Sequence, residues 1–314
     1  MITGGAGFIG SNLTERCIKK GWTVDIVDDL SNGHREFVPT GVRNQIYADF
    51  ADKNVLEHIK NKVYDVVFHL AAVPRVSYSV EHPVETNDVN VSNTLRLMDA
   101  CRGSVKRFVF ASSSSVYGGA DKLPTPANHP KNPKSPYALQ KSIIEDYLAM
   151  YEELYGLKYT ALRFFNVFGK NQLGNSPYAT AVSAWLDAIK RGQSMRSDGN
   201  GSQSRDMCHV DNVTQACVLA ATSETLDTKV FNVACGDRVE NKQVLEYLLK
   251  RFPDARFHTA PWRAGDVMHT MADISMTKAA LGYKVEMPFW AGLEKTIEWH
   301  DKSWDLIKGL TLKT

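Results

Sequence analysis

The stretch GGAGFIG at residues 4–10 is the feature from which the fold can be deduced. Its glycines at 4, 7 and 10 have the spacing G-x-x-G-x-x-G. Glycine allows a tight turn and lets backbone N–H groups at a helix N-terminus approach a pyrophosphate. Residues 11–20 suit that helix, although a glycine pattern by itself also fits an ordinary turn.

The next apolar run, residues 24–27, ends in an acidic pair that gives the glycine turn its context. Asp28 lies 24 residues after Gly4. An acidic side chain at that point can accept both ribose hydroxyls of NAD and repels the 2′-phosphate of NADP. We therefore expect NAD as the cofactor, whereas Asp29 fits a solvated turn residue.

Further apolar runs predict the fold class. β-branched and aromatic residues dominate 24–27, 65–70, 107–111, 159–164 and 230–233, and several runs are apolar on both faces. Such runs, alternating with helical patterns, predict an α/β fold with a doubly wound parallel sheet (Rossmann) and a smaller C-terminal α/β substrate domain. We expect the NAD-binding domain at 1–169 and 209–234, and the smaller substrate domain at 170–208 and 235–314.

Composition excludes several classes of protein. The 314 residues are 43% hydrophobic and 23% charged, and 37 Lys and Arg against 35 Asp and Glu leave a net charge of +2. We expect no nucleic-acid partner and no membrane partner, because both need a basic or long apolar surface. The five cysteines are widely spaced and fit reduced thiols, and the start of the chain leaves no room for a signal peptide. These features predict a cytoplasmic protein without a metal site.

A tyrosine and a lysine four residues apart form the second signal. Ser135 suits a helix N-cap and Pro136 the first helical position, so Tyr137 and Lys141 share one helix face. An ammonium beside a phenol favours the phenolate, so we expect the pKa of Tyr137 to fall toward working pH. The same spacing arises by chance on many helices.

Serines follow the expected strand at 107–111. Residues 112–115 are all serine, and ligands of open α/β sheets lie beyond the carboxyl ends of the strands. A hydroxyl there can hydrogen-bond a reacting alcohol, although a plain serine-rich loop has the same composition.

Together these motifs resemble the extended short-chain dehydrogenase/reductase family, and in particular its nucleotide-sugar 4-epimerases. The resemblance runs almost from end to end, through TGGAGFIGS (3–11), HLAA (69–72), SSSVYG (113–118), YALQK (137–141), LRFFNVFG (162–169), SRD (204–206) and RAGD (263–266).

The resemblance implies a role for each matching residue. Tyr137 is then the general base, Lys141 its partner and a ribose ligand, and Ser113 the residue that positions the sugar hydroxyl. The implied NAD contacts, besides Tyr137 and Lys141, are Gly4, Gly7, Phe8, Ile9, Gly10, Asp28, Asn32, Asp49, Phe50, Leu70, Ala71, Ala72 and Asn90. The implied substrate contacts, besides Ser113, are Asn166, Arg205, Arg263, Asp266 and Thr270. Two of these residues, Arg205 and Arg263, suit a pyrophosphate, because guanidinium groups form paired hydrogen bonds with phosphate oxygens.

The loop after Ser113 indicates which reaction follows oxidation at carbon 4. Dehydratases of the family carry Asp-Glu where this chain has Ser114 and Ser115, and decarboxylases carry a Glu in this loop. The resemblance therefore implies an epimerase that keeps its NAD. A non-catalytic NAD-binding sensor and an oxidoreductase that releases NADH are the alternatives.

Thr270 bears on the sugar. Family members restricted to plain hexoses place a Tyr at this position, so a small Thr leaves room for an N-acetyl group. The resemblance thus favours UDP-GlcNAc and UDP-GalNAc, with UDP-glucose/UDP-galactose or a UDP-uronate as alternatives. Thr270 can also be a simple packing residue.

The family resemblance further implies a homodimer. Apolar stripes on the expected helices at 88–102 and 137–155 (Leu95, Met98, Ile144, Leu148, Tyr151) fit a four-helix interface, and they equally fit core packing. The chain departs from the family in having only two residues before Thr3, which predicts a short first strand, and in carrying Phe164 where many relatives have Tyr.

Overall fold

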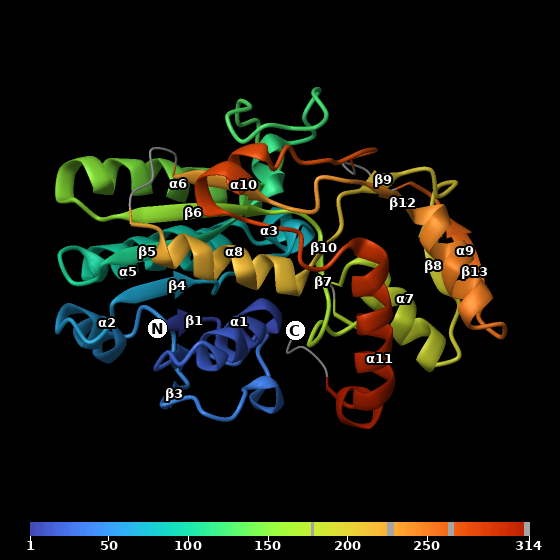
Figure 1. Ribbon diagram of the computed structural model, residues 1–314, viewed down its shortest axis with the longest axis horizontal. Helices are drawn as coiled ribbons and strands as arrows, with labels where there is room; N and C mark the ends of the chain where they lie inside the picture. Colours follow the sequence, from blue (N-terminus) through green and yellow to red (C-terminus); the bar gives the residue numbers. More distant parts are fainter. Residues whose placement is uncertain (177–178, 225–228, 263–266, 311–314) are drawn as a thin grey trace.

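A seven-stranded parallel sheet forms the centre of the molecule (Figure 1), in the order β11-β6-β5-β4-β1-β2-β3. The computed structural model describes residues 1–176, 179–224, 229–262 and 267–310. Every neighbouring pair in this sheet is parallel. The doubly wound α/β class predicted from the sequence is confirmed.

All five apolar runs form strands of this sheet. The strands are β1 (Ile2–Thr3), β2 (Asp25–Val27), β3 (Asn44–Ile46), β4 (Val66–His69), β5 (Arg107–Ser113), β6 (Tyr159–Phe164) and β11 (Val230–Val233). As predicted, β1 is short. It has two residues, and in the sheet it lies between β2 and β4. Three two-stranded sheets contain β7 (Val167–Phe168) with β10 (Cys208–His209), β9 (Ser204–Arg205) with β12 (Val239–Glu240), and β8 (Met195–Asp198) with β13 (Phe257–Ala260).

The helices connect these strands. They are α1 (Phe8–Lys19), α2 (Lys53–Lys60), α3 (Val76–Glu81), α4 (Pro83–Asn87), α5 (Thr94–Cys101), α6 (Pro136–Tyr155), α7 (Ala181–Lys190), α8 (Val210–Thr222), α9 (Asn241–Arg251), α10 (Ser275–Leu281) and α11 (Phe289–Ile307). Single turns of 3₁₀ helix lie at η1 (Arg35–Phe37) and η3 (Ser114–Tyr117), and the π-helical turn η2 (Asp88–Asn93) leads into α5.

Alternation along the strands explains the two helical layers. In β5, Val109 packs in one cluster with residues of α1, α8 and α10, whereas Phe108 and Phe110 pack in a second cluster with residues of α2, α5 and α6. Successive side chains of a strand point to opposite faces, so a strand buried on both faces must be apolar throughout. This is why the sheet strands read as continuous apolar runs.

The elements α7, α9, β8 and β13 form a smaller body to the right of the sheet in Figure 1. They have a hydrophobic cluster of their own, which includes Trp185, Met195 and Leu248 and reaches Phe289 and Leu293 of α11. Between them in sequence, α8 and β11 return to the large sheet. The division at residues 169, 208 and 234 stays a prediction, and α10 (Ser275–Leu281), from the predicted second domain, packs on the cluster of the large sheet.

The apolar stripes assigned to a dimer interface need a correction. Met98, Ile144 and Leu148 are fully buried within this single chain, because they cover the β5 face of the sheet. The exposed apolar residues of α6 are instead Leu139, Met150, Leu154 and Tyr155. The homodimer itself stays a prediction.

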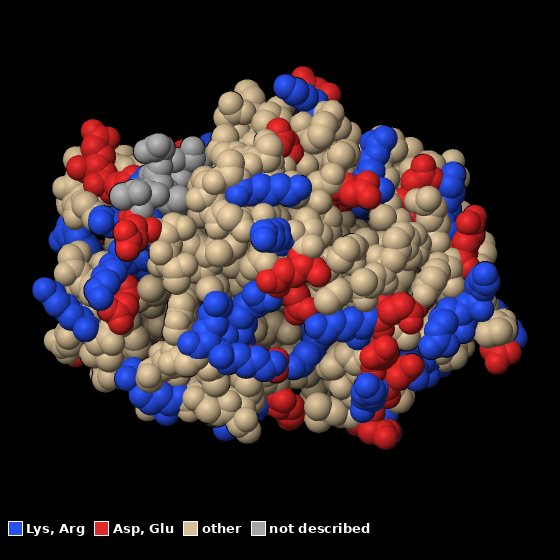
Figure 2. Space-filling view, viewed as in Figure 1, with Lys and Arg blue, Asp and Glu red and all other residues tan. Residues whose placement is uncertain are grey.

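Charges of both signs are interspersed over the face shown in Figure 2, in keeping with the small net charge. None of the helices in the described ranges is long and apolar enough to cross a bilayer.

Candidate active site

The loops at the carboxyl edge of the large sheet contain most of the predicted site residues. Gly4 follows β1, Asp28 follows β2, Leu70 follows β4, and Ser113 ends β5. Because the strands are parallel, these ends meet at one edge, where open α/β sheets bind their ligands. The position of this edge was predictable, but the exact neighbours of each residue were not.

The glycine turn fits a pyrophosphate. Gly4 has a φ of +69°, which only glycine adopts without cost, and its N–H donates to the Val27 carbonyl at 2.8 Å. A Cβ on Gly10 would lie 1.9 Å from the Gly4 carbonyl oxygen, so the third glycine lets α1 pack directly on the turn. Within the described part of the chain no side chain caps the N-terminus at Gly7. Uncapped N–H groups at this end suit an anion.

Replacing Gly10 by Ala is therefore expected to weaken NAD binding. The added Cβ must displace the Gly4 backbone, and overpacking of this kind costs about 1–3 kcal/mol, which is roughly tenfold or more in affinity. The NAD content of the purified protein and the NAD affinity of the stripped protein measure the effect. Gly309→Ala is the control, because no atom lies within 4 Å of its added Cβ. Unchanged NAD binding in Gly10→Ala would contradict this account of the turn.

Asp28 is buried at the end of β2 and fixed by two backbone donors. Its Oδ2 accepts from the Ala6 N–H at 3.0 Å and its Oδ1 from the Leu30 N–H at 2.9 Å. Burial raises the pKa of Asp28, against these hydrogen bonds. A Cβ on Gly33 would lie 2.5 Å from Asp28 Oδ1, so the Asn32-Gly33 turn passes directly over the carboxylate. Each carboxylate oxygen keeps acceptor capacity for a ribose hydroxyl.

Two residues that the sequence did not assign fix the loop after β4. The Thr3 hydroxyl accepts from the N–H groups of Leu70 and Ala71 at 3.2 Å each. His69 is fully buried, with Nδ1 2.8 Å from the Thr3 hydroxyl and Nε2 2.9 Å from the Thr94 hydroxyl. Burial keeps the pKa of His69 well below its ordinary value, so the ring is neutral and can join the two hydroxyls. Both residues belong to the motif stretches, which is the signal that could have found them.

The other predicted NAD residues surround this loop. Ala72 directly continues it, Phe50 packs on the His69 ring at 4.8 Å between centroids, and exposed Asp49 accepts from the Asn93 amide at 3.1 Å. Asn90, in η2, donates to the Val73 carbonyl and accepts from its N–H, at 3.0 and 2.8 Å. The described contacts of Asn90 are therefore with protein, and they hold the loop in place.

The serine–tyrosine–lysine set comes together between β5 and α6. Ser135 caps α6 through its side chain and Pro136 opens it, as the sequence predicted. The Ser113 hydroxyl, at the end of β5, interacts with the Tyr137 phenol and accepts from the Ser115 hydroxyl at 2.9 Å. Lys141 Nζ lies 5.8 Å from the centroid of the Tyr137 ring.

The prediction that the pKa of Tyr137 falls toward working pH is wrong for this structure. Burial raises the pKa of Tyr137 to about 12, and the hydrogen bond from Ser113 only partly opposes this. Burial likewise lowers the pKa of Lys141 to about 7. The Lys141 ammonium points to the Ala111 carbonyl, at 2.8 Å, and lies over the Phe110 ring, so it does not contact the phenol oxygen. The effect of burial on the pKa of Tyr137 outweighs the effect of the nearby Lys141 charge.

A buried ion pair supports the catalytic strand and helix. Glu145, one turn after Lys141, accepts from both ends of the Arg163 guanidinium at 2.8 and 2.6 Å and from the Ser112 hydroxyl at 2.6 Å. Arg163 also donates to the Tyr117 hydroxyl at 2.8 Å. The network joins α6, β5 and β6 next to Ser113 and Lys141. In the sequence, only the position of Glu145, four residues after Lys141, pointed to this network.

The predicted substrate residues that the structure describes come from three segments: Asn166 follows β6, Arg205 lies in β9, and Thr270 precedes α10. Asn166, with a φ of +28°, donates through Nδ2 to the Thr270 hydroxyl at 3.3 Å. Arg205 is half-buried, and its Nη1 donates to the Met268 carbonyl at 3.1 Å. Arg263 and Asp266 lie outside the described residues. The structure thus brings Asn166 and Thr270 into contact and places Arg205 on the adjoining strand.

Asp206 connects these residues and was not assigned from the sequence beyond its motif. Its carboxylate accepts from the N–H groups of Cys235, Gly236 and Ala272 at 2.9, 3.0 and 3.1 Å. Its own N–H donates to the Thr270 hydroxyl at 3.2 Å. Burial raises the pKa of Asp206 to about 7, although the three backbone donors favour the charged form. The side chain therefore holds three segments of the substrate region together.

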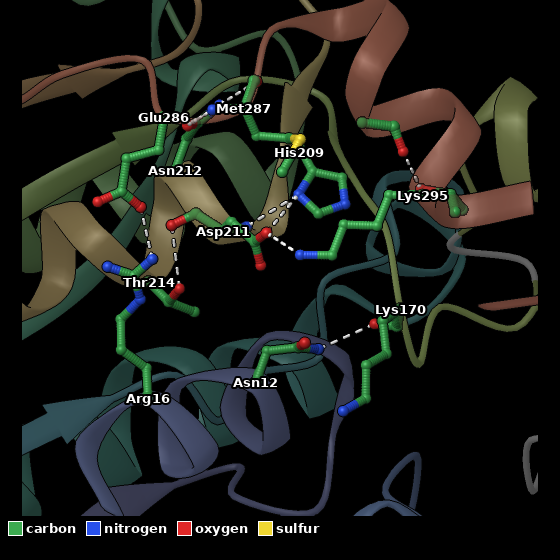
Figure 3. Close-up of polar contacts among 12 residues, drawn as sticks. Asn12, Arg16, Lys170, His209, Asp211, Asn212, Thr214, Glu286, Met287 and Lys295 are labelled. Carbon is green, nitrogen blue, oxygen red and sulfur yellow. Dashed lines mark hydrogen bonds and ion pairs between the residues drawn. The ribbon is translucent and has the colours of Figure 1, made fainter. Parts of the chain in front are cut away.

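Polar contacts tie this region to the glycine-turn helix (Figure 3). His209 caps α8 by accepting from the Asp211 N–H at 3.2 Å, and Lys295 of α11 donates to the Asp211 carboxylate at 2.6 Å. Burial lowers the pKa of His209 to about 4, so its ring is a neutral acceptor. On the other side, Asn12 of α1 donates to the Lys170 carbonyl at 2.9 Å. The NAD side and the substrate side are thus held in a fixed relation.

Comparison with known proteins extends these observations. Residues 1–234 match the sequence model of the NAD dependent epimerase/dehydratase family. A UDP-glucose 4-epimerase from Mycolicibacterium smegmatis is 34% identical over 309 residues, which cover 95% of this chain and 97% of the relative. A UDP-N-acetyl-alpha-D-glucosaminuronate decarboxylase from Bacillus cytotoxicus is 29% identical over 315 residues, covering 95% and 96%.

Solved structures give the same picture. The UDP-N-acetylglucosamine 4-epimerase of Methanobrevibacter ruminantium M1, in complex with UDP-N-acetylmuramic acid, superposes with a TM-score of 0.90 at 36% identity, covering 96% of this chain and 97% of the other. The UDP-glucose 4-epimerase of Thermotoga maritima, with UDP-glucose, gives a TM-score of 0.91 at 32% identity, covering 96% and 98%. Both similarities extend over nearly the whole chain.

Proposed function

Because the chain belongs to the NAD dependent epimerase/dehydratase family, we propose that its site inverts carbon 4 of a UDP-sugar. The observation that carries this is the meeting of Ser113, Tyr137 and Lys141 at the sheet edge beside the glycine turn. The relatives named as UDP-sugar 4-epimerases, at 32–36% identity, support the same reaction.

The residues divide the work of the reaction between them. The glycine turn and Asp28 would hold NAD, whose nicotinamide would supply a reversible hydride acceptor for carbon 4 of the sugar. Tyr137 takes the proton of the 4-hydroxyl, while Ser113 holds that hydroxyl by a hydrogen bond. Lys141, in the proposed role, binds the cofactor ribose and keeps positive charge near the phenol. Ser113 and Tyr137 are half-buried, and a bound sugar would cover them, so that the keto sugar could rotate in the site without being hydrated or released.

The pKa values fit a phenol that releases its proton only when the site is filled. With a pKa of about 12, Tyr137 is protonated at neutral pH in the protein by itself. Lys141, with a pKa near 7, is only partly charged. Donation from the Lys141 ammonium to ribose hydroxyls would favour the charged lysine, and a positive charge on the cofactor ring would favour the phenolate.

Elimination and decarboxylation are less well supported. An acid is needed to help water leave the sugar, and the side chains after Ser113 are Ser114 and Ser115. In the structure the Ser115 hydroxyl donates to Ser113. The decarboxylase relative shows that the family includes such chemistry, so product analysis should include the 4-keto and decarboxylated sugars.

For the sugar we propose UDP-GlcNAc and UDP-GalNAc, with UDP-glucose/UDP-galactose as the alternative that two relatives favour. Half-buried Thr270 supports the first choice, because its small side chain contacts Asn166 rather than filling the space beyond it. A UDP-uronate is the remaining alternative. It would need a cation near carbon 6, for which half-buried Arg75 is a candidate.

Turnover of a panel of UDP-GlcNAc, UDP-glucose and UDP-glucuronate tests the sugar directly. We expect Thr270→Tyr to lower kcat/KM for UDP-GlcNAc by roughly 10–200-fold while UDP-glucose is less affected, because a bulky ring occupies the N-acetyl space. Thr270→Val is the matched control, since it removes the hydroxyl that accepts from Asp206 and keeps the size. A wild-type preference for UDP-glucose would refute the N-acetyl assignment.

A further inference from the structure

The first turn of α6, which carries Tyr137, has an unusual way of satisfying its backbone. The first N–H groups of a helix have no partner within it, and an unpaired buried N–H is costly. Pro136 has no N–H, and the Ala138 N–H donates to the Ser135 side chain at 3.2 Å. The N–H of Tyr137 donates outside the helix, to the Ser79 hydroxyl of α3 at 3.1 Å.

Ser79 is built into this position. Its side chain is fully buried, and its hydroxyl donates to the Val76 carbonyl at 2.6 Å. Because the single hydroxyl proton is used on Val76, the oxygen presents its lone pairs to Tyr137. The hydrogen bond therefore joins the backbone of the proposed base to α3, a helix that follows the NAD loop after β4.

A second buried contact holds α6 close to its first turn. Gln140, three residues after Tyr137, donates through Nε2 to the Thr86 hydroxyl of α4 at 2.9 Å. Its Oε1 accepts from the Asn90 amide at 2.8 Å. Asn90 in turn holds the backbone of Val73 in the NAD loop. All of these side chains except that of Val73 are buried, so water cannot replace the bonds easily.

We propose that Ser79 is a positioning residue for the reaction, and that it sets the distance of Tyr137 from Ser113 and from the NAD loop. The inference rests on the proposed function, in which Tyr137 is the base. The contacts of Gln140 with Thr86 and Asn90 hold α6 against α4 and η2, and Ser79 holds the first turn of α6. A shift of about 1 Å in a reacting group can cost roughly 100-fold in rate.

The test compares Ser79→Ala with Ser77→Ala. Ser77 lies on the same helix, is exposed, and only accepts from the Arg75 side chain at 3.0 Å, which makes it a matched control. We expect Ser79→Ala to lower kcat about 10- to 100-fold. KM for the UDP-sugar and the NAD content should stay within about twofold, because neither ligand touches Ser79 in this account. Ser77→Ala should match the wild type.

The pH profile separates positioning from mere loss of stability. The hydrogen bond with Ser113 lowers the pKa of Tyr137 against the effect of burial. If Tyr137 moves away from Ser113, that opposing effect is lost and the pKa of the phenol rises further. The limb of the kcat profile that reports the phenol should therefore move to higher pH in Ser79→Ala. Thr86→Val, which keeps the shape and removes the acceptor of Gln140, should move the limb in the same direction by less.

One readout decides the inference independently of the proposed function. A crystal structure of Ser79→Ala should show the first turn of α6 displaced from β5 and the Tyr137 phenol farther from the Ser113 hydroxyl, and an unmoved turn overturns the inference whatever the activity. A lower kcat with an unchanged pH profile overturns it as well. If the wild type turns over no UDP-sugar, the proposed function fails, while the displacement in the crystal still decides the role of Ser79.

Discussion

Replacing Tyr137 by Phe should reduce turnover of the UDP-sugar by about 10²- to 10⁴-fold, the range that a positioned acid–base group contributes. The phenol is the group that interacts with Ser113, and Phe removes its oxygen while it keeps the aromatic ring at this position of α6. The helix N-terminus is unaffected, because Ser79 bonds to the backbone N–H of this residue and not to its side chain.

The measurement is kcat for epimerisation together with the NAD content of the purified variant. NAD should remain bound, since the glycine turn and Asp28 are untouched. Tyr155→Phe, at the exposed end of the same helix, is the control and should behave as the wild type, because the cation–π contact of its ring with Arg102 survives the change. If Tyr137→Phe retains more than about a tenth of the activity, the proton goes to another group and the proposed role of Tyr137 is wrong.

The second large effect is expected on stability, from Glu145→Gln. The pair of Glu145 with Arg163 is buried at both ends, with side chains only 3% and 5% exposed. Removing one partner leaves a charged guanidinium without its counter-charge, which costs roughly 3–5 kcal/mol in buried pairs. Gln also weakens the bond to Ser112, so β5 loosens next to Ser113. Urea unfolding followed by circular dichroism should show a clearly lower midpoint.

Two further variants show whether the pairing is the cause. Asp146→Asn lies next in sequence and removes an exposed carboxylate bonded to Lys131, so its midpoint should hardly change. The double variant Glu145→Met with Arg163→Met removes both charges, and it should be less destabilised than Glu145→Gln, because no unpaired charge remains. A Glu145→Gln midpoint equal to that of Asp146→Asn would contradict the role assigned to the buried pair.

Local patterns in the sequence were enough to predict much of the fold. The mostly apolar runs at 107–111 and 159–164 fitted strands covered on both faces, and they form β5 and β6. Ser135 and Pro136 placed the start of α6 correctly, because capping depends on residues within one turn. The apolar stripes fitted a dimer interface and core packing equally, and the structure shows core packing for Met98, Ile144 and Leu148. A helix periodicity shows which face is apolar, and it does not show whether the chain itself or a second copy covers that face.

The sequence by itself determined the glycine turn at 4–10, the acidic end of β2 and the shared face of Tyr137 and Lys141, since each depends on neighbours in the chain. The tertiary structure alone decided that Ser79 bonds to Tyr137 from 58 positions away, that Asp206 gathers three distant segments, and that Arg163 meets Glu145. It also decided the direction of the Tyr137 pKa. Burial sets desolvation, and burial exists only once residues far apart in the chain have packed together.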